Sequence, residues 1–237
     1  MGVETLVSGA KELKIDLSDR DIERFQEYKR LLQEWNTKIN ITAITDDIEI
    51  DIKHFLDSMT SFATGKLHGK KRVIDVGTGG GFPGIPLKII NEELEITLLD
   101  SLNKRINFLK EVISSLELKG IEAIHGRAEE LGRDKEYRET YDICMSRAVA
   151  SLDTLCEYCM PFVKPGGYFI SMKGSDIDGE LEEAKNAINK LGGKLVEKKI
   201  IRIPESDIEH SLLIIEKISK TPTKYPRGGG KPRKNPL

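Results

Sequence analysis

A glycine-rich turn that directly follows an apolar stretch constrains the fold of this 237-residue chain more than any other feature. The apolar stretch runs from Val73 to Val76, and the turn runs from Gly77 to Gly84. Prolines and large aliphatic residues follow, and proline is tolerated in a first helical turn. This order predicts a buried strand, a tight turn and a helix N-terminus. Because glycine lets a backbone approach a ligand closely, the turn predicts a ligand site.

Two ligand-binding motifs overlap in this turn. Gly79-x-Gly81-x-x-Gly84 fits a dinucleotide fingerprint, whereas Asp75-x-Gly77-x-Gly79-x-Gly81 fits the first motif of S-adenosylmethionine methyltransferases. A carboxylate on the ligand-facing end of the strand would repel a pyrophosphate but suits a cationic sulfonium. The sequence therefore favours S-adenosylmethionine as cofactor, and an NAD-dependent oxidoreductase is the rival interpretation.

The composition is that of a globular protein, with 38% hydrophobic and 32% charged residues. The chain contains neither an apolar run of the ~18 residues that a membrane helix needs nor a signal peptide, so we expect a cytoplasmic protein without a membrane partner. Three cysteines, Cys144, Cys156 and Cys159, predict free, buried thiols. The histidines lack metal-ligand spacing, so no metal site is expected.

The chain divides into three predicted parts: a helical extension over residues 1–64, a cofactor-binding domain over 65–218 and a basic tail over 219–237. Residues 1–17 are weakly patterned and are expected to fray. Apolar periodicity predicts helices over 18–40 and 47–63. From residue 71, strands alternate with helices, which predicts an α/β fold with a mostly parallel sheet covered on both faces. The predicted strands are 72–76, 95–99, 121–125, 141–145, 167–172, 194–203 and 210–217, the last two antiparallel, and the predicted helices between them are 104–116, 152–162 and 178–191.

The tail differs in charge from the rest of the chain. It carries seven lysines and arginines and no acidic residue from Lys217 to Leu237, although the whole chain has a net charge of −2. An acidic body with a basic tail predicts a contact surface for a polyanion. The tail lacks apolar residues for a core, so we expect it to become ordered only on binding.

Ligands of parallel sheets lie at the carboxyl ends of the strands, so the residues there are candidate site residues. Gly77, Gly79 and Phe82 follow the first strand, and Asp100 follows the second. A carboxylate at that place typically accepts both ribose hydroxyls of an adenosine, although Asp100 could instead cap the next helix.

The later strands end in further candidates. Ala128 and Glu129 follow the third strand and could bracket an adenine edge, although Glu129 could simply begin a helix. Arg147 follows the fourth and could hold the cofactor's carboxylate or a substrate phosphate, with a surface salt bridge as the alternative. Lys173 follows the fifth and could reach RNA or remain solvated.

Several further segments, taken with the turn, make the chain similar to a known family, the small-subunit ribosomal RNA guanine-N7 methyltransferases, once called glucose-inhibited division protein B. The resemblance covers nearly the whole chain. It rests on these segments: Glu34-Trp35-Asn36, Asn40-Ile41-Thr42, His54-Phe55-Leu56-Asp57-Ser58, Asp75 to Pro86, Asp100-Ser101-Leu102-x-Lys104-Arg105, Gly126-Arg127-Ala128-Glu129, Ser146-Arg147-Ala148, Met172-Lys173-Gly174 and Thr221-Pro222-x-Lys224-Tyr225-Pro226-Arg227. The chain departs from the family at Gly228 to Gly230, which are richer in glycine, and at His210, where arginine is frequent.

The resemblance implies a Rossmann-like class I S-adenosylmethionine-dependent methyltransferase fold with a seven-stranded sheet and an N-terminal helical extension. It implies methyl transfer from S-adenosylmethionine to N7 of one guanine in small-subunit (16S) ribosomal RNA, as RNA or as an assembling 30S particle. Guanine N7 has a free lone pair and no proton, so no catalytic base is expected. We expect a monomer. By carry-over the cofactor contacts are Gly77, Phe82, Ala128, Glu129 and Arg147, to which the strand-end argument adds Gly79 and Asp100; the candidate RNA contacts are Arg147, Lys173, His210, Lys224, Arg227 and Arg233.

Three other functions fit parts of this pattern. A methyltransferase acting on another RNA or on a small molecule would share the cofactor motif, but the basic tail disfavours a small substrate. A non-catalytic RNA-binding relative would keep the fold without the cofactor. The intact glycine turn and Asp100 disfavour that last interpretation.

Overall fold

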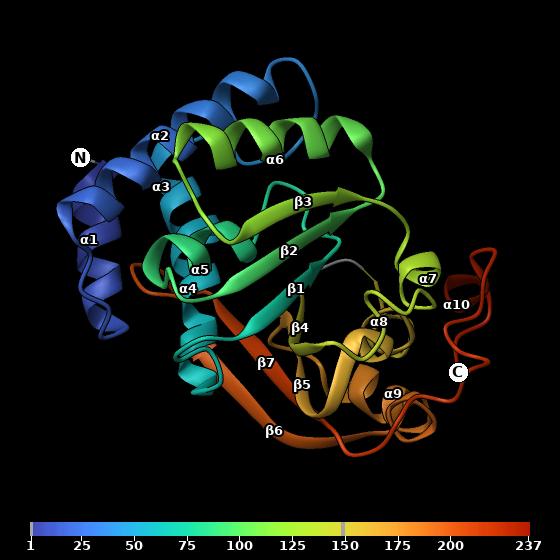
Figure 1. Cartoon of the computed structure of the whole chain (residues 1–237). Helices are drawn as coiled ribbons and strands as arrows, with labels where there is room; N and C mark the ends of the chain where they lie inside the picture. Colours follow the sequence, from blue (N-terminus) through green and yellow to red (C-terminus); the bar gives the residue numbers. More distant parts are fainter. Residues whose placement is uncertain (1, 148–149) are drawn as a thin grey trace.

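A single seven-stranded sheet forms the centre of the protein (Figure 1), of which the computed structural model describes residues 2–147 and 150–237. The strand order is β3-β2-β1-β4-β5-β7-β6. Only β7 runs antiparallel to its neighbours, which confirms the predicted mostly parallel sheet and its antiparallel last pair. The strands are β1 (Arg72–Val76), β2 (Glu95–Asp100), β3 (Ile121–His125), β4 (Tyr141–Arg147), β5 (Val163–Gly174), β6 (Gly193–Arg202) and β7 (Glu209–Lys217).

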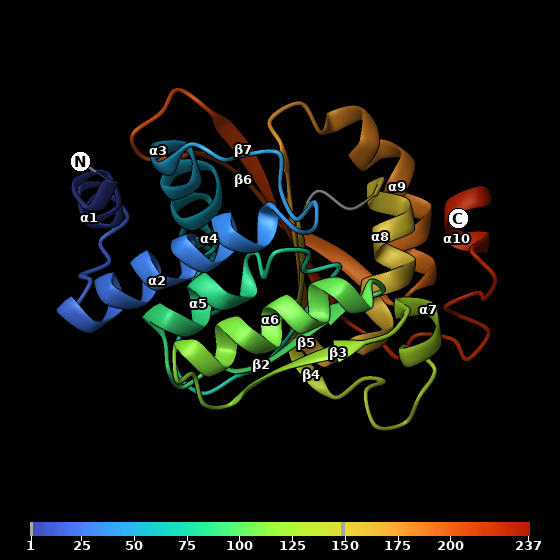
Figure 2. The same cartoon turned by 90° about the horizontal axis from the view of Figure 1, so that it is seen from above.

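Helices cover both faces of the sheet (Figure 2). The N-terminal helices together with α5 and α6 pack on one face, and α8 and α9 pack on the other. Because both faces are covered, the central strands β1 and β2 are buried along nearly their whole length, as expected for parallel strands. The helices that follow β1 are α5 (Gly84–Ile90), α6 (Asn103–Ser115), α7 (Ala128–Leu131), α8 (Leu152–Cys159), the 3₁₀ turn η3 (Met160–Phe162), α9 (Asp178–Lys190) and α10 (Lys231–Lys234).

The order of the strands reverses at β1, because β2 and β4 lie on its two sides. In open parallel sheets the crevice at such a reversal is the usual place for a ligand. The glycine turn leaves β1 at this point and enters α5, as predicted.

The N-terminal extension begins with a helix, so the prediction that residues 1–17 fray is wrong for the described part. Helix α1 (Gly2–Glu12) buries Leu6 and Ala10, which lie one turn apart on the same face. At Gly9 an added Cβ would lie 2.3 Å from the side chain of Leu56, so α1 packs very closely against a later helical segment of the extension. The apolar face of α1 is too short for the helix to be predicted from sequence. It is sufficient to stabilise the helix when the rest of the protein covers it.

The rest of the extension has two helical stretches, as predicted. Helix α2 (Asp19–Asn36) starts at Ser18, whose side chain and backbone form the expected capping box with Asp21. The second stretch is continuous over residues 47–64 but is not one regular α-helix. It consists of α3 (Asp47–Ile50), a π-helical segment η1 (Asp51–Leu56), α4 (Asp57–Met59) and a 3₁₀ segment η2 (Thr60–Thr64).

The basic tail is folded against the domain in this structure, which contradicts the expectation that it orders only on binding. Tyr225, Pro226 and Pro232 are buried, and the short helix α10 lies beside α8. Hydrogen bonds and one ion pair, rather than a large apolar face, hold the tail in place.

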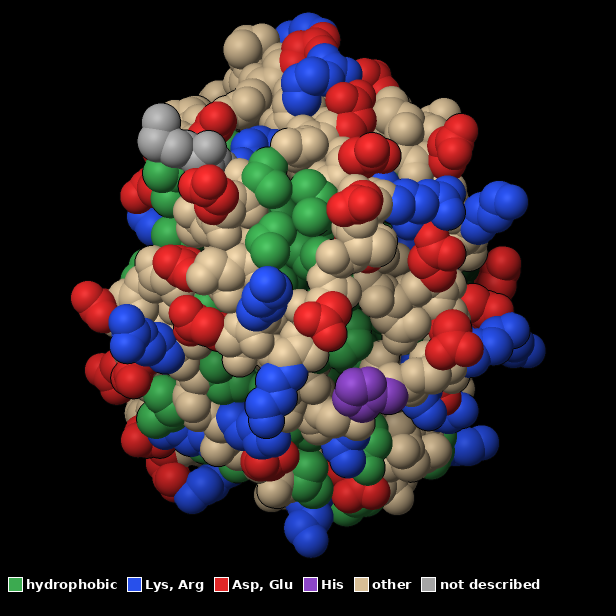
Figure 3. Space-filling view, turned by 90° about the vertical axis from the view of Figure 1, so that its left-hand side faces the viewer, with side chains coloured by type: hydrophobic (Ala, Val, Ile, Leu, Met, Phe, Trp, Pro, Cys, Tyr) green, Lys and Arg blue, Asp and Glu red, His purple; other side chains and the backbone are tan. Residues whose placement is uncertain are grey.

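The face of the molecule on the side of the N-terminal helices carries acidic and basic side chains interspersed, with a small apolar patch between them (Figure 3). Within the described ranges, no helix combines the length and the apolar character that crossing a bilayer requires.

Candidate functional site

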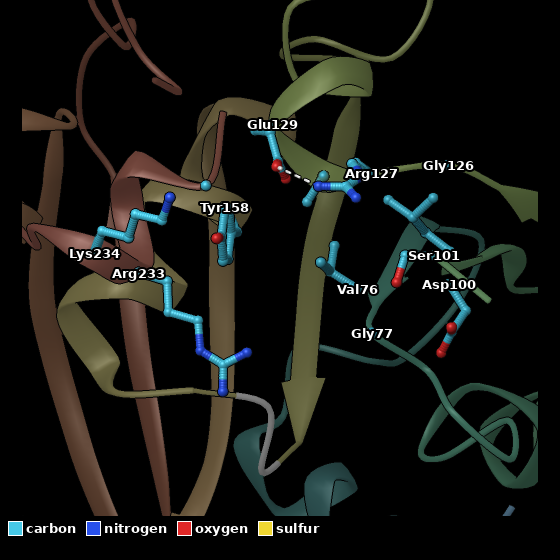
Figure 4. A pocket seen from close by; sticks show the side chains of 13 residues that line it. Val76, Gly77, Asp100, Ser101, Gly126, Arg127, Glu129, Tyr158, Arg233 and Lys234 are labelled. Carbon is cyan, nitrogen blue, oxygen red and sulfur yellow. Dashed lines mark ion pairs between the residues drawn. The ribbon is translucent and has the colours of Figure 1, made fainter. Parts of the chain in front are cut away.

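A cavity of about 390 Å³ opens at the carboxyl ends of β1, β2 and β3 (Figure 4). Four of the predicted cofactor residues line it together: Gly77, Asp100, Ala128 and Glu129. The structure thus brings residues from three separate strand ends to one place, as the topology argument expected. The remaining lining residues are Val76, Leu99, Ser101, Gly126, Arg127, Tyr158, Gly230, Arg233 and Lys234.

The glycine turn needs its glycines for backbone geometry. Gly77, Gly79 and Gly81 have φ angles of 73°, 60° and 97°, in the left-handed region that other residues rarely adopt. Gly81 also has no room for a side chain, because an added Cβ would lie 2.6 Å from Ile85 and 2.7 Å from the hydroxyl of Tyr28. The extension therefore packs against the turn at Gly81, whereas Gly77 faces the cavity.

Asp100 links this turn to the next strand. Its Oδ2 accepts a hydrogen bond from the backbone N–H of Gly79 at 3.0 Å, and its Oδ1 accepts one from Leu102 at 2.8 Å. The N-cap residue of α6 is Leu102, and α6 has no side-chain cap hydrogen bond, so the alternative that Asp100 caps this helix is wrong. Asp100 also lines the cavity, so a structural and a ligand-binding role are compatible in the same carboxylate.

Asp75 does not face the ligand, contrary to the sequence-based expectation. It is 1% exposed, and its Oδ2 accepts hydrogen bonds from the Thr78 hydroxyl at 2.7 Å and from the Gly84 N–H at 3.0 Å. Burial raises the pKa of Asp75 to about 7 against these two hydrogen bonds. Asp75 therefore ties the two ends of the glycine turn together from inside, and its repulsion of a pyrophosphate is no argument for the cofactor.

The adenine side of the predicted site is formed by the start of α7. Ala128 opens this helix and Glu129 lies in its first turn, where a negative side chain is favoured. Glu129 is 8% exposed, and its carboxylate lies 3.7 Å from Nη1 of Arg127. Glu129 therefore lies in the first turn of a helix and also lines the cavity.

Arg147 lies outside the first cavity. It lines a second one, of about 760 Å³, next to the carboxyl ends of β4 and β5. Its Nη1 pairs with Oδ2 of Asp57 at 2.6 Å, and Nη2 lies 3.3 Å from Nδ1 of His54. The neighbouring residue Ala148, part of the motif used above, lies outside the described residues.

Asp57 joins this arginine to His210. Nδ1 of His210 lies 2.5 Å from Oδ1 of Asp57, and its Nε2 lies 2.9 Å from the hydroxyl of Thr60. Burial would raise the pKa of Asp57, but the hydrogen bond from His210 and the charge of Arg147 hold it below its ordinary value. An ionised, buried carboxylate from the extension therefore positions two basic side chains of the domain.

Phe82, from the glycine turn, contacts two residues of the second cavity, His54 and Arg147. The rings of Phe82 and His54 stack with centroids 4.4 Å apart, and the guanidinium of Arg147 lies 5.0 Å from the centre of the Phe82 ring. Burial, with the positive charge of Arg147, lowers the pKa of His54 to about 4. Phe82 and Gly79 belong to the turn but do not line the first cavity.

The remaining candidate RNA residues are dispersed. Lys173 lines the second cavity and pairs with Glu180 at 2.6 Å. Lys224 is exposed, with its ammonium 5.1 Å from the ring of Tyr225. Arg227 pairs with Glu157 at 2.6 Å, and Arg233 lines the first cavity.

Sequence reasoning did not assign several residues of the first cavity to the site. Ser101 and Arg127 are adjacent in sequence to the predicted residues Asp100 and Ala128. The strand ends therefore indicated their place to within one residue. Tyr158 lies inside α8, and Gly230 and Lys234 belong to the tail; no motif marks them, because only folding brings them to the strand ends.

Other kinds of site have little support in the described ranges. No group of three or more histidine, cysteine, aspartate or glutamate side chains there could hold a metal ion. The three cysteines are buried and free, as predicted.

Solved structures with low sequence identity share this fold. A mutant of MtNAS superimposes with a TM-score of 0.57 at 14% identity, over 84% of this chain and 76% of the other. TYW2 of M. jannaschii, solved in complex with AdoMet, superimposes with a TM-score of 0.51 at 18% identity, over 68% and 77%. The predicted class I S-adenosylmethionine-dependent methyltransferase fold is confirmed.

Relatives with higher identity extend over nearly the whole chain. Ribosomal RNA small subunit methyltransferase G of Alkaliphilus metalliredigens is 53% identical over 232 residues, which cover 98% of this chain and 97% of the relative. The protein of the same name from Thermoanaerobacter pseudethanolicus is 52% identical over 235 residues, with 99% and 98% covered. The family model described as rRNA small subunit methyltransferase G matches residues 21–208. With these matches and this cavity, the chain belongs to the rRNA small subunit methyltransferase G family, as its sequence motifs suggested.

Proposed function

We propose that this protein transfers the methyl group of S-adenosylmethionine to N7 of a guanine in small-subunit (16S) ribosomal RNA. The observation that carries the proposal is the cavity at the carboxyl ends of β1–β3, in a chain of this family, with Gly77, Asp100, Ala128 and Glu129 in its wall. Its volume of about 390 Å³ lies within the range of small-molecule and cofactor sites.

The residues of the cavity fit an adenosine cofactor. Asp100 offers a carboxylate beside the glycine turn, where it can accept ribose hydroxyl groups. The backbone at Ala128 and the side chain of Glu129 line the cavity and would receive the adenine edge. Gly77 allows close approach to the amino-acid portion, and Phe82, which contacts the His54 ring and the Arg147 guanidinium, supports the turn at that end.

S-adenosylmethionine supplies a methyl group on a positively charged sulfur, which is already an electrophile. Guanine N7 attacks with its free lone pair and has no proton to lose, so the protein needs no general base. Its own residues must orient the two reactants, and orientation alone accounts for about 7–11 kcal/mol of a barrier in favourable cases. The pairing of Arg147 and His210 with Asp57 fits such a role, because it holds basic groups rigidly rather than freeing them for proton transfer.

The second cavity is the proposed RNA side. Arg147, Lys173 and His210 lie on its wall, at the strand ends next to the cofactor cavity. N7 lies on the major-groove edge, which is deep and narrow in A-form RNA. The target guanine therefore belongs in a loop or a distorted helix, and the same guanine inside a long perfect duplex should be a poor substrate.

We further assign residues 1–64, 65–218 and 219–237 as extension, methyltransferase domain and tail. We also propose that the protein acts as a monomer. It works in the cytoplasm, where ribosomal RNA and assembling 30S particles are found. Among the tail residues, Lys224 is exposed and available to RNA, while Arg227 is already engaged by Glu157.

The test is a methylation assay with methyl-labelled S-adenosylmethionine on small-subunit RNA and on particles that lack the modification. The product is mapped by chemical cleavage at 7-methylguanosine. Label at the N7 of a single guanine is the expected result. Label at another atom would refute the proposed chemistry, and efficient methylation of free small molecules without RNA would favour a small-molecule methyltransferase.

A further inference from the structure

The C-terminal tail forms one wall of the cofactor cavity. Gly230, Arg233 and Lys234 line that cavity together with the strand-end residues. Figure 4 shows Arg233 and Lys234 on the wall opposite Asp100 and Ser101, with Tyr158 on the same side as the tail. The basic C-terminal tail therefore contacts the cavity at the carboxyl ends of β1–β3.

Two arginines that precede β4 fasten the tail through its backbone. Nη1 of Arg138 donates to the carbonyl of Tyr225 at 2.9 Å, and its Nη2 donates to that of Thr221 at 2.7 Å. Nε of Arg133 donates to the carbonyl of Pro226 at 2.7 Å. Hydrogen bonds from charged donors are about twice as strong as neutral ones, so these contacts fix the path of the tail.

One face of α8 completes the anchorage. Glu157, which is 0% exposed, accepts from the backbone N–H of Arg227 at 2.7 Å and from its guanidinium at 2.6 Å. Thr154, one turn earlier, donates to the carbonyl of Pro232 at 3.2 Å. Tyr158 follows directly and lines the cavity, so the face that holds the tail also borders the site.

The basic side chains in and near the cavity differ in whether an acidic residue already pairs with them. S-adenosylmethionine carries one anionic group, its carboxylate. Arg127 is already close to Glu129, and Arg147 is paired with Asp57 outside this cavity. Arg233 and Lys234 are exposed side chains, and within the described ranges no ion pair engages either of them.

We propose that the docked tail is part of the cofactor site, and that Arg233 binds the carboxylate of S-adenosylmethionine. This inference rests on the proposed function for its cofactor but not for its RNA substrate. It assigns to the tail a role different from the RNA contact that its charge suggested. Lys234 adds a second positive charge to the same wall.

The test is calorimetric titration of the full-length protein with S-adenosylhomocysteine, which keeps the carboxylate, in the absence of RNA. Arg233→Ala should weaken binding about tenfold, the value expected for the loss of one hydrogen-bonded charge partner. Lys231→Ala is the matched control, because Lys231 is an exposed basic residue of the same short helix that does not line the cavity. This control should bind like the wild type, and Arg233→Lys should recover part of the affinity.

A second ligand separates the carboxylate from the rest of the cofactor. 5′-Methylthioadenosine has the adenosine and the sulfur but no amino-acid portion, so its affinity should be the same for Arg233→Ala and for the wild type. Equal weakening of both ligands would refute the carboxylate assignment. Unchanged binding of S-adenosylhomocysteine would refute the cofactor role of the tail altogether.

Thermal unfolding of each variant keeps the result interpretable, because a melting temperature like that of the wild type shows that the fold is intact. The two hypotheses also fail separately. If the protein binds S-adenosylhomocysteine through Arg233 but does not methylate guanine N7, the proposed function fails and the inference stands. If it methylates N7 while Arg233→Ala binds both ligands normally, the inference fails alone.

Discussion

The segments at the two ends of the chain both pack against the central domain, but they do so with different chemistry. The N-terminal extension docks through aromatic rings: Tyr28 lies 5.3 Å from Phe55 and 5.5 Å from Phe82 of the glycine turn, measured between centroids. The C-terminal tail docks through hydrogen bonds to its carbonyl groups and through the Arg227–Glu157 pair.

This difference determines how much stability the protein loses when a mutation removes each kind of contact. Apolar docking loses stability in proportion to the buried area and cavity that a substitution leaves. A buried charge pair costs most when one partner is removed, because the other remains buried without compensation. Four predictions, from the largest expected effect to the smallest, test this contrast.

Phe55→Ala should lower the free energy of unfolding by about 3–5 kcal/mol, because Phe55 is fully buried among Phe25, Tyr28 and Phe82. Urea denaturation followed by circular dichroism measures the change. Ile218→Ala, at a side chain that is 58% exposed, should stay within about 0.5 kcal/mol of the wild type. A loss below about 1 kcal/mol for Phe55→Ala would show that the extension is not held by this aromatic cluster.

Arg227→Ala should cost about 2–4 kcal/mol, since it leaves the carboxylate of Glu157 buried and unpaired. Replacing both partners, as in Arg227→Met with Glu157→Leu, should recover much of this loss. Lys185→Ala, which breaks an exposed pair with Glu182, is the control and should have no measurable effect. If the double variant were no more stable than Arg227→Ala, the ion pair would not explain the docking of the tail.

The extension should also make stability depend on pH through His54. Its pKa falls from 6.5 unfolded to about 4 folded, so the unfolded state binds more protons in this window, and stability is lost as the pH falls from 6.5 towards 4. The stability advantage of the wild type over His54→Asn should therefore shrink by roughly 2–3 kcal/mol across that range. Urea denaturation at several pH values measures this difference, and Ile218→Ala should keep the pH profile of the wild type. A constant difference would mean that His54 keeps an ordinary pKa in the folded protein.

Ser18→Ala should cost about 1 kcal/mol, because it removes the side-chain oxygen that accepts from the N–H of Asp21 at the start of α2. Thr223→Ala, in an exposed part of the tail, should be neutral in the same urea titration. An effect as large as that of Phe55→Ala would mean that the docking of the extension depends on its helix cap as much as on its aromatic face.

Much of the fold was predictable because its signals are local. The apolar runs of β1 and β3 gave their observed bounds, 72–76 and 121–125, and the capping box at Ser18 marked the start of α2. Helix α1 was missed because its buried face consists of only Leu6 and Ala10. The docking of the tail was missed because arginine side chains of the domain bind the tail's own backbone carbonyls, which every sequence has and no residue pattern marks.

The candidate site was predictable to the same extent. Residues at or near the carboxyl end of a strand, such as Asp100 and Ala128, could be placed at the cavity because the sheet brings strand ends together. The inward orientation of Asp75 and the pairing of Arg147 with Asp57 could not be predicted, because both depend on partners that only the folded chain brings into contact.

The sequence by itself determined the local ingredients of the sheet, the glycine turn and the family, since these follow from residue type and short spacing. Only the tertiary structure decided which basic residues face the cofactor and which face other parts of the protein. The physical reason is that a charged side chain takes its role from the partner that burial brings to it, and Arg147, Arg227 and Arg233 acquire three different partners or surroundings from the same chemical group.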